Sequence, residues 1–471
     1  MGPNVLLIVL DTARADALEP YGAPAGASPV IADLARRGTA VQGRATACWT
    51  VPSHASIFTG LMPRAAGLAR APGGTPHGCR PVLEAQRERL LAEVMRRAGY
   101  ETRGITTNLW LTEASGFATG FETFEEVETD RQGKLHADSL RDRVAWAGEA
   151  LRARADDGAA RAAAILERWA GERRERPFFW FVNLVECHSP YLPPKPYNDL
   201  GPIERLRAAE DARRYLTLGA IWQACAGGLE VPHEALERMR HLYASAVRVL
   251  DDWVGRALES LDANGLLDET LVIVCSDHGE NFGDQGLMGH AFSLDERLTR
   301  VPLVVAGPGA PESDAPLSLA AIPRVAAQAA GVVGHPYGEG APAPGIGLAQ
   351  FDPPAPRDDP RWNEALRAWG LGEEVKDRLA EPLAAATDGR WKLVVQGASE
   401  RLFDLRSDSL EEHALPLDSD PDAVGRLREA LGAELAVRPA TPGAAANEDA
   451  AQPSPEELRE LEERMKLLGY M

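Results

Sequence analysis

Residues 4–16 read NVLLIVLDTARAD, an apolar run that stops abruptly at the carboxylate of Asp11. The apolar part, residues 5–10, has the length of a strand and is far shorter than the roughly 18 residues that a membrane-spanning helix needs. In open α/β sheets, ligand and catalytic groups gather at the carboxyl ends of the strands. The stretch therefore predicts a sheet strand that is followed at once by a candidate site residue.

Similar runs recur along the chain and alternate with loops and helical segments. The clearest further strands are expected at 104–107, 178–185, 271–275 and 302–306. Helical periodicity, with many Ala, Leu, Glu and Arg residues, is found at 87–98, 141–171 and 234–263. This alternation predicts an α/β fold with a large, mainly parallel sheet sandwiched by helices.

The character of the sequence changes in a Gly- and Pro-rich stretch, residues 331–360, which marks a boundary or a crossover loop. Beyond it, 391–395 and 401–405 flank a turn that contains Gly, and they predict an antiparallel hairpin. Helices are expected at 421–435 and 455–468. The C-terminal part thus predicts a smaller antiparallel sheet with helices.

We divide the chain into a catalytic domain, residues 1–345, and a C-terminal α+β subdomain, residues 346–471, packed on it. Two segments, 131–176 and 197–232, are expected to be helical excursions from the catalytic domain. They can serve as a lid or substrate-specific wall, or they can be simple packing appendages, and the sequence favours neither.

Composition and charge limit the possible partners. The 471 residues are 45% hydrophobic and 25% charged, which excludes disorder, collagen and coiled coil as descriptions of the whole chain. The formal net charge of -20 repels nucleic acid and anionic lipid surfaces, so we expect no nucleic-acid partner and no membrane span. Residues 1–4 carry no basic segment and no cleavage site follows, which predicts a cytoplasmic protein. The oligomeric state is left open.

Five cysteines are scattered along the chain without a CxxC pair. An odd number in this arrangement fits buried, reduced thiols better than a disulfide framework or a zinc knot.

Polar residues follow several of the predicted strands directly. Asp11 ends the first strand, and Asn108 follows the 104–107 strand. Glu186 and His188 follow the 178–185 strand, and the segment SDHGE, residues 276–280, follows the 271–275 strand. If these strands are neighbours, their polar ends converge on one point.

A convergence of Asp11 with Asp277 and His278 gives hard oxygen ligands and one imidazole, which is a donor set for a divalent cation. Taken singly, each residue is weak evidence for a metal site, because an Asp after a strand is more often a cap or turn residue. The joint placement favours a metal site.

A second candidate element is TACWTVPSHASIFTG at residues 46–60. Pro52 suits the first turn of a helix, and Ile57 and Phe58 supply its buried face. Thr50 then lies beside a helix N-terminus, where unpaired N–H groups and the helix dipole favour an anion. Beside a metal its hydroxyl can be deprotonated, although the stretch by itself fits a simple helix cap equally well.

Three of these segments, in this order, resemble signature segments of the sulfatase family within the alkaline phosphatase superfamily. They are LDTARAD at 10–16, TVPSHAS at 50–56 with TG at 59–60, and SDHGE at 276–280. Further stretches agree with the family pattern at 90–102, 177–191, 300–303, 391–393, 402–405 and 467–470. The resemblance implies the sulfatase-like fold and a hydrolase that cleaves small sulfate or phosphate esters, using one divalent cation (Ca, Mg, Mn or Zn).

Position by position, the resemblance implies that Asp11, Asp277 and His278 bind the metal and that Thr50 is both the nucleophile and a further metal ligand. Where many members of the family have a second Asp, this chain has Thr12. The loss of that ligand makes the chain similar to the single-metal branch with a threonine nucleophile, such as phosphoglycerol transferases of the lipoteichoic acid synthase type.

The residue at position 50 is the most informative departure from the family pattern. True sulfatases carry a Cys or Ser there, which is converted to formylglycine, and the second hydroxyl of the aldehyde hydrate then expels sulfate. Threonine cannot become that aldehyde, and Cys48 lies two positions too early to replace it. A phosphothreonine can be resolved by in-line attack of water or of an acceptor alcohol. We therefore expect phosphate mono- or diester cleavage or phosphoryl transfer, with sulfuric ester hydrolysis and a catalytically silent binding protein as alternatives.

The resemblance also implies roles for residues around the metal. His188 and His290 are expected to contact the transferred group or to protonate the leaving oxygen. Asn108 is expected to hold developing negative charge on the substrate. His54 and Arg14 are assigned to substrate binding, mainly by orienting the ligands, and a purely structural salt bridge is an equal alternative for Arg14.

Overall fold

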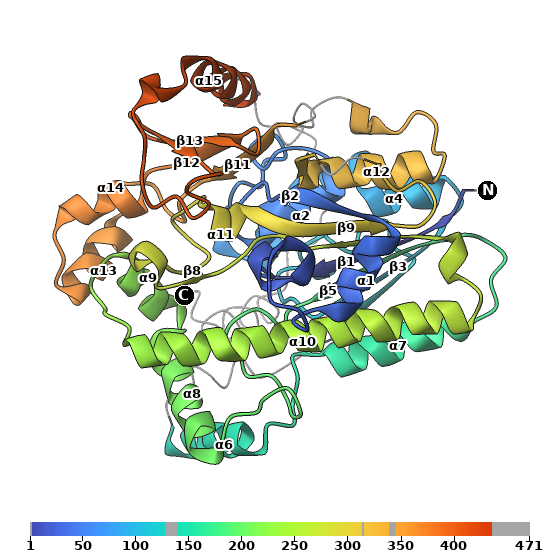
Figure 1. Ribbon diagram of the computed structural model, residues 1–471, viewed down its shortest axis with the longest axis horizontal. Helices are drawn as coiled ribbons and strands as arrows, with labels where there is room; N and C mark the ends of the chain where they lie inside the picture. Colours follow the sequence, from blue (N-terminus) through green and yellow to red (C-terminus); the bar gives the residue numbers. More distant parts are fainter. Residues whose placement is uncertain (1, 128–138, 313–314, 339–344, 436–471) are drawn as a thin grey trace.

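The computed structural model describes residues 2–127, 139–312, 315–338 and 345–435 (Figure 1). Its centre is an eight-stranded sheet with the strand order β10-β2-β9-β6-β1-β5-β3-β4. The strands of this sheet are β1 (Asn4–Leu10), β2 (Thr39–Arg44), β3 (Glu101–Thr106), β4 (Thr123–Glu126), β5 (Phe178–Leu184), β6 (Thr270–Cys275), β9 (Arg300–Ala306) and β10 (Leu317–Ser318).

The middle of the sheet is parallel. β1 pairs in parallel with both β5 and β6, and β3 pairs in parallel with β4 and β5. β9 is the exception, because it runs antiparallel to both β6 and β2. The expected α/β fold with a mainly parallel sheet is confirmed.

Alternate residues of β1 point into two separate cores. Leu6 and Ile8 belong to one hydrophobic cluster, and Val5, Leu7 and Val9 belong to the other. The strand reads as one apolar run because both of its faces are covered. Helices α1, α7 and α10 contribute to the first core, whereas α2, α4 and α12 contribute to the second (Figure 1).

The helices of the described residues connect and flank these strands. They are α1 (Pro29–Arg37), α2 (Thr50–Thr59), α3 (Arg80–Ala85), α4 (Leu91–Arg97), α6 (Leu140–Arg152), α7 (Ala159–Gly171), α8 (Pro202–Tyr215), α9 (Leu218–Cys225), α10 (His233–Ala263), α11 (Glu296–Thr299), α12 (Ile322–Ala329), α13 (Pro360–Trp369), α14 (Lys376–Leu379) and α15 (Pro421–Leu435). Among them, no helix combines the length and the apolar character that crossing a membrane requires.

The stretch of helical periodicity at 141–171 contains two helices, α6 and α7, separated by a break. α6 ends at Ala153, which has a left-handed φ of 45°, and α7 starts after Gly158 with φ of 109°. The carboxylate of Glu186 accepts hydrogen bonds from the backbone N–H groups of Asp157 and Ala159. Glu186, which follows β5, therefore caps a helix, and this long-range cap supports the start of α7.

The C-terminal part forms a separate antiparallel sheet in the order β11-β12-β13-β14. Its strands are β11 (Gly347–Phe351), β12 (Leu383–Thr387), β13 (Trp391–Gln396) and β14 (Ser399–Asp404), and α15 packs on β12 and β13. The predicted hairpin is confirmed as β13 and β14. The helix expected at 455–468 lies outside the described residues.

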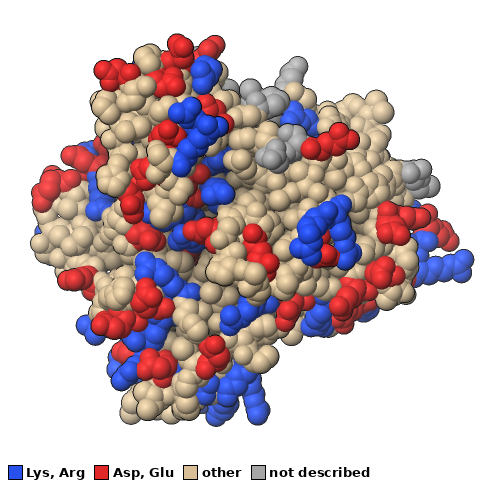
Figure 2. Space-filling model, in the orientation of Figure 1, with Lys and Arg blue, Asp and Glu red and all other residues tan. Residues whose placement is uncertain are grey.

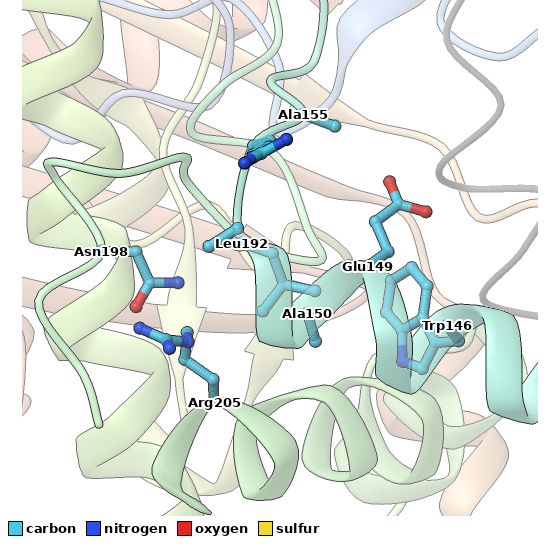
Figure 3. Close-up of a pocket in the computed structure, with 9 residues that line it drawn as sticks. Trp146, Glu149, Ala150, Ala155, Leu192, Asn198 and Arg205 are labelled. Carbon is cyan, nitrogen blue, oxygen red and sulfur yellow. The ribbon is translucent and has the colours of Figure 1, made fainter. Parts of the chain in front are cut away.

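Of the helices in these excursions, α6 and α8 lie below α10 in Figure 1 and pack against each other, whereas α9 lies above α10. A small pocket opens between α6, α8 and the loop that precedes α8 (Figure 3). On its wall, Asn198 Oδ1 and Arg205 Nε have no hydrogen-bond partner among the described residues, which is the usual environment of an ordered water. The pocket shares no lining residue with the predicted catalytic site.

The cysteines agree with the prediction made from the sequence. All five cysteines are buried and free, as expected. Figure 2 shows acidic and basic side chains interspersed over one face of the molecule. In the part that is coloured, that face has no continuous basic surface of the kind that nucleic-acid binding uses.

Candidate active site

The carboxyl ends of β1 and β6 bring the three predicted metal ligands together. Val9 in β1 is in register with Cys275 in β6, so Asp11 emerges beside the segment that holds Asp277 and His278. All three side chains are fully buried. One ligand atom from each lies within 4.8 Å of the others, which is close enough for a single cation to contact all three.

The hydrogen bonds of His278 leave one ring nitrogen available. Its Nδ1 donates to the carbonyl oxygen of Gly279 at 3.0 Å, so Nε2 is the ring nitrogen that is available to a metal ion. This Nε2 and Asp277 Oδ2 have no hydrogen-bond partner in the described residues, yet they lie 3.3 Å apart in a buried site. A divalent cation bound by both atoms would satisfy them, so these residues fit a metal ion.

Neighbouring groups favour the charged form of Asp277. Burial alone would raise the pKa of this carboxyl, but His278 and His54 beside it hold the pKa well below its usual range. A carboxylate that stays ionised is the form that binds a metal.

Thr12 joins the side chains of the two predicted acidic ligands, Asp11 and Asp277. Its hydroxyl donates to Asp11 Oδ1 at 2.8 Å, and its backbone N–H donates to Asp277 Oδ1 at 3.1 Å. Its φ of 64° is a left-handed conformation that is uncommon for a residue other than glycine. Thr12 therefore orients the two carboxylates.

Thr50 is the first residue of α2 and is buried. Trp49 before it makes no side-chain cap, so the first N–H groups of α2 have no partner from that side chain. Asn108 Nδ2 donates to Asp11 Oδ2 at 2.8 Å and lies 3.5 Å from Thr50 Oγ1. One amide group thus links the residue 50 hydroxyl to a metal ligand.

His54 lies one turn further along α2 and is fully buried. Its Nδ1 donates to Thr50 O at 3.0 Å and lies 3.4 Å from Asp277 Oδ2. Burial would lower the pKa of His54, but the nearby carboxylates Asp277 and Asp11 raise it above its ordinary value. The ring connects the start of α2 with the metal ligands.

Asn183, in β5, is a site residue that the sequence reasoning missed. Its Nδ2 donates to Asp11 Oδ2 at 3.2 Å and lies 3.4 Å from His54 Nε2. Its Oδ1 has no partner in the described residues. The available signal was an amide inside the apolar strand FFWFVNL. Asn is disfavoured in such a strand unless its side chain has hydrogen-bond partners.

His188 and His290 lie beside the ligands. The ring of His290 lies 4.6 Å from that of His278 and 4.9 Å from that of His188, measured between ring centroids. His290 Nδ1 lies 3.0 Å from Glu280 Oε1. Burial would raise the pKa of Glu280, but His290, His188 and Tyr191 together lower it.

Arg14 forms ion pairs with carboxylates. Its guanidinium makes two hydrogen bonds to Asp16, at 2.8 and 2.6 Å, and one to the carbonyl oxygen of Glu280 at 3.1 Å. Asp284 lies 3.6 Å away. Arg14 therefore ties the loop after β1 to the loop that follows the metal ligands.

The sequence of this chain matches the sulfatase family model over residues 3–332. The chain belongs to the sulfatase family. It is 28% identical to a choline-sulfatase of Rhizobium meliloti over 263 residues, which cover 52% of this chain and 48% of that protein. It is 26% identical to the multifunctional alkaline phosphatase superfamily protein PehA of Trinickia caryophylli, covering 65% and 68% of the two chains. The chain thus spans about half the length of the choline-sulfatase.

Solved structures of the superfamily share the fold. A phosphonate monoester hydrolase of Agrobacterium radiobacter superposes with a TM-score of 0.62 at 22% identity and covers 92% of this chain and 95% of its own. A 2-O GAG sulfatase superposes with a TM-score of 0.60 at 16% identity. The superposition covers 92% of this chain and 91% of the sulfatase chain. The predicted family and fold are confirmed, whereas the nucleophile and the substrate stay predictions.

Proposed function

We propose that this sulfatase-family protein is a metal-dependent hydrolase of phosphate mono- or diesters, or a phosphotransferase, with Thr50 as its nucleophile. The observation that carries the proposal is the position of Asn108, whose amide nitrogen lies 2.8 Å from Asp11 Oδ2 and 3.5 Å from Thr50 Oγ1. The hydroxyl of residue 50 is therefore within a few ångströms of the buried ligand set.

The ligand set consists of Asp11, Asp277 and His278, with Thr50 as a fourth donor. A divalent cation held there would lower the pKa of the Thr50 hydroxyl and neutralise negative charge on the transferred group. The unpartnered Asp277 Oδ2 and His278 Nε2 supply the donors that such an ion needs.

Other residues of the chain would have separate roles in the reaction. Thr50 Oγ1 attacks phosphorus in line with the leaving oxygen. Asn108 and the first N–H groups of α2 hold the negative charge that develops on the transferred group. His188 and His290 contact that group or deliver a proton to the leaving oxygen.

The choice of phosphorus over sulfur rests on the chemistry of residue 50. A phosphothreonine can be opened by a second in-line attack, from water or from an acceptor alcohol. A sulfated threonine lacks the second hydroxyl of a formylglycine hydrate, so it has no elimination route. The observation that favours the sulfuric ester alternative is that several relatives are named as sulfatases, among them the choline-sulfatase and an arylsulfatase of Clostridium perfringens.

The deciding experiment is a panel of aryl phosphates, phosphate diesters and sulfates, tested on metal-loaded wild type, Thr50→Ala and Thr50→Ser. We expect Thr50→Ala to abolish phosphoester turnover, whereas Thr50→Ser, which keeps a hydroxyl, retains measurable turnover. Peptide mapping after incubation with an activated ester should find the adduct on residue 50. Turnover that persists in Thr50→Ala would refute the nucleophile assignment.

The same panel separates the alternatives. Preferential turnover of sulfate esters would favour sulfuric ester hydrolysis, and would require a route without formylglycine at residue 50. A metal-loaded wild type that turns over no ester would favour a binding protein on this scaffold.

A further inference from the structure

His290 is held from one side by a buried carboxylate. Its Nδ1 lies 3.0 Å from Oε1 of Glu280, and the side chain of Glu280 is 1% exposed. A carboxylate accepts hydrogen bonds, so Nδ1 carries a proton and donates it to Glu280. The other ring nitrogen, Nε2, is then on the opposite edge of the ring, away from this contact.

A second residue fixes the carboxylate itself. The hydroxyl of Tyr191 donates to Oε2 of Glu280, so each oxygen of the carboxylate has its own donor. Tyr191 is 1% exposed, and its ring packs edge-on against Tyr243 and also against Phe282. The Glu280 carboxylate therefore has little freedom to rotate, and neither does the imidazole that it holds.

The ring of His290 is directed towards the metal ligands and is partly accessible. It lies 4.6 Å from the ring of His278 and 4.9 Å from that of His188, and its side chain is 19% exposed. Because Nδ1 contacts Glu280, Nε2 is the ring nitrogen that is left for a contact with the substrate.

We propose that Glu280 and Tyr191 are positioning residues that fix the orientation of the His290 ring, and that the imidazolium form of His290, with its Nδ1 proton held by Glu280, donates its Nε2 proton to the leaving-group oxygen. This inference rests on the proposed function and deepens it, because it separates the role of His290 from that of His188. The arrangement follows the general logic by which a buried carboxylate orients a catalytic histidine.

The proton balance of the reaction is then complete. In the first step Thr50 Oγ1 forms a bond to phosphorus and loses its hydroxyl proton to solvent. The bond from phosphorus to the leaving oxygen breaks, and the proton on His290 Nε2 moves to that oxygen, which departs as an alcohol. In the second step water attacks phosphorus and gives a proton to His290 Nε2, the bond from phosphorus to Thr50 Oγ1 breaks to release phosphate, and Thr50 Oγ1 takes a proton back from solvent.

The first test varies the acidity of the leaving group. A 4-nitrophenyl ester releases an anion that needs no proton, whereas a phenyl ester depends on one. We expect Glu280→Gln to lower kcat on the phenyl ester by about 100-fold and on the 4-nitrophenyl ester by less than about fivefold. Tyr191→Phe, which removes one hydroxyl and keeps the charge, should act in the same direction with a smaller effect.

A matched control is Glu186→Gln. Glu186 is also a buried carboxylate, but it accepts backbone hydrogen bonds at the start of α7. This variant should lower stability without changing the ratio of the two rates. Equal losses on both esters in Glu280→Gln and in Tyr191→Phe would overturn the proposal. If Glu280→Gln does not fold, the ratio in Tyr191→Phe decides.

The second test needs no turnover and keeps this inference separate from the proposed function. Nitrogen-15 NMR of the histidine rings, assigned with His290→Gln, should show Nδ1 of His290 protonated in the wild type. Glu280→Gln should shift the Nδ1 resonance of His290 and leave the ring signals of the exposed His241 unchanged. An unchanged His290 signal would overturn the positioning role, whether or not the wild type cleaves any ester.

Discussion

A divalent cation should stabilise the wild-type chain, and Asp277→Asn should abolish that stabilisation. The ligand atoms of Asp11, Asp277 and His278 lie within 4.8 Å of one another, and all three side chains are fully buried. Two carboxylate charges 4.8 Å apart repel by about 3.5 kcal/mol at an effective dielectric constant of about 20. A bound cation converts this repulsion into attraction, so its binding is coupled to folding.

The size of the effect follows from mass action. At a free cation concentration 100 times its Kd, the free energy of unfolding should rise by about 2.7 kcal/mol in the wild type. Asp277→Asn removes a carboxylate whose pKa the fold holds below its usual range, so in EDTA we expect the variant to be less stable than the wild type. It should gain no stability when cation is added.

The assay is urea unfolding in EDTA and in a series of Mn²⁺, Mg²⁺, Ca²⁺ and Zn²⁺ concentrations. The control variant is Asp408→Asn, because Asp408, Glu412 and His413 form a second, exposed group whose ligand atoms also lie within 4.8 Å. Asp408→Asn should keep the full response to cation. The reasoning is refuted if Asp277→Asn responds like the wild type, or if the response is lost in Asp408→Asn instead.

Three further perturbations test other parts of the structure. Lys392 is 1% exposed and pairs with two buried glutamates that link the two sheets, so Lys392→Met should cost about 3–5 kcal/mol in urea unfolding. Burial raises the pKa of Asp251 to about 6 from an ordinary 3.8, so the stability it contributes is complete below pH 3.8 and is lost as pH rises through 6. Relative to Asp251→Asn, the wild type should lose up to about 3 kcal/mol between pH 4 and pH 8, measured by unfolding at each pH. Asn183→Leu removes one donor to Asp11, so calorimetry should show cation affinity reduced by about 10–100-fold with the fold retained.

The sequence predicted those parts of the site that depend on local pattern. Asp11 and Asp277 each follow a buried apolar strand, and the register of β1 with β6 brings those two strand ends together. Thr50 begins a helix because Pro52 and the apolar residues after it favour one. In each case the local preference and the tertiary fold agree.

The features that sequence reasoning missed depend on partners that are distant along the chain. The break between α6 and α7 is capped by Glu186, 27 residues after Ala159. β9 runs antiparallel although its apolar run looks like those of its parallel neighbours. Asn183 acquires its role only because β5 lies next to β1 in the sheet. Local propensity carries no information about such pairings.

The contacts around the ligands divide the site into two sides. Thr50 Oγ1 is linked through Asn108 to Asp11, whereas the rings of His188 and His290 lie on the side of His278. An in-line displacement needs the attacking and leaving oxygens on opposite sides of phosphorus. A nucleophile beside Asp11 therefore calls for a proton donor beside His278. In the proposed mechanism the buried Glu280 contact orients His290 for that position, and the predicted ligands Asp11 and Asp277 follow the ends of the neighbouring strands β1 and β6.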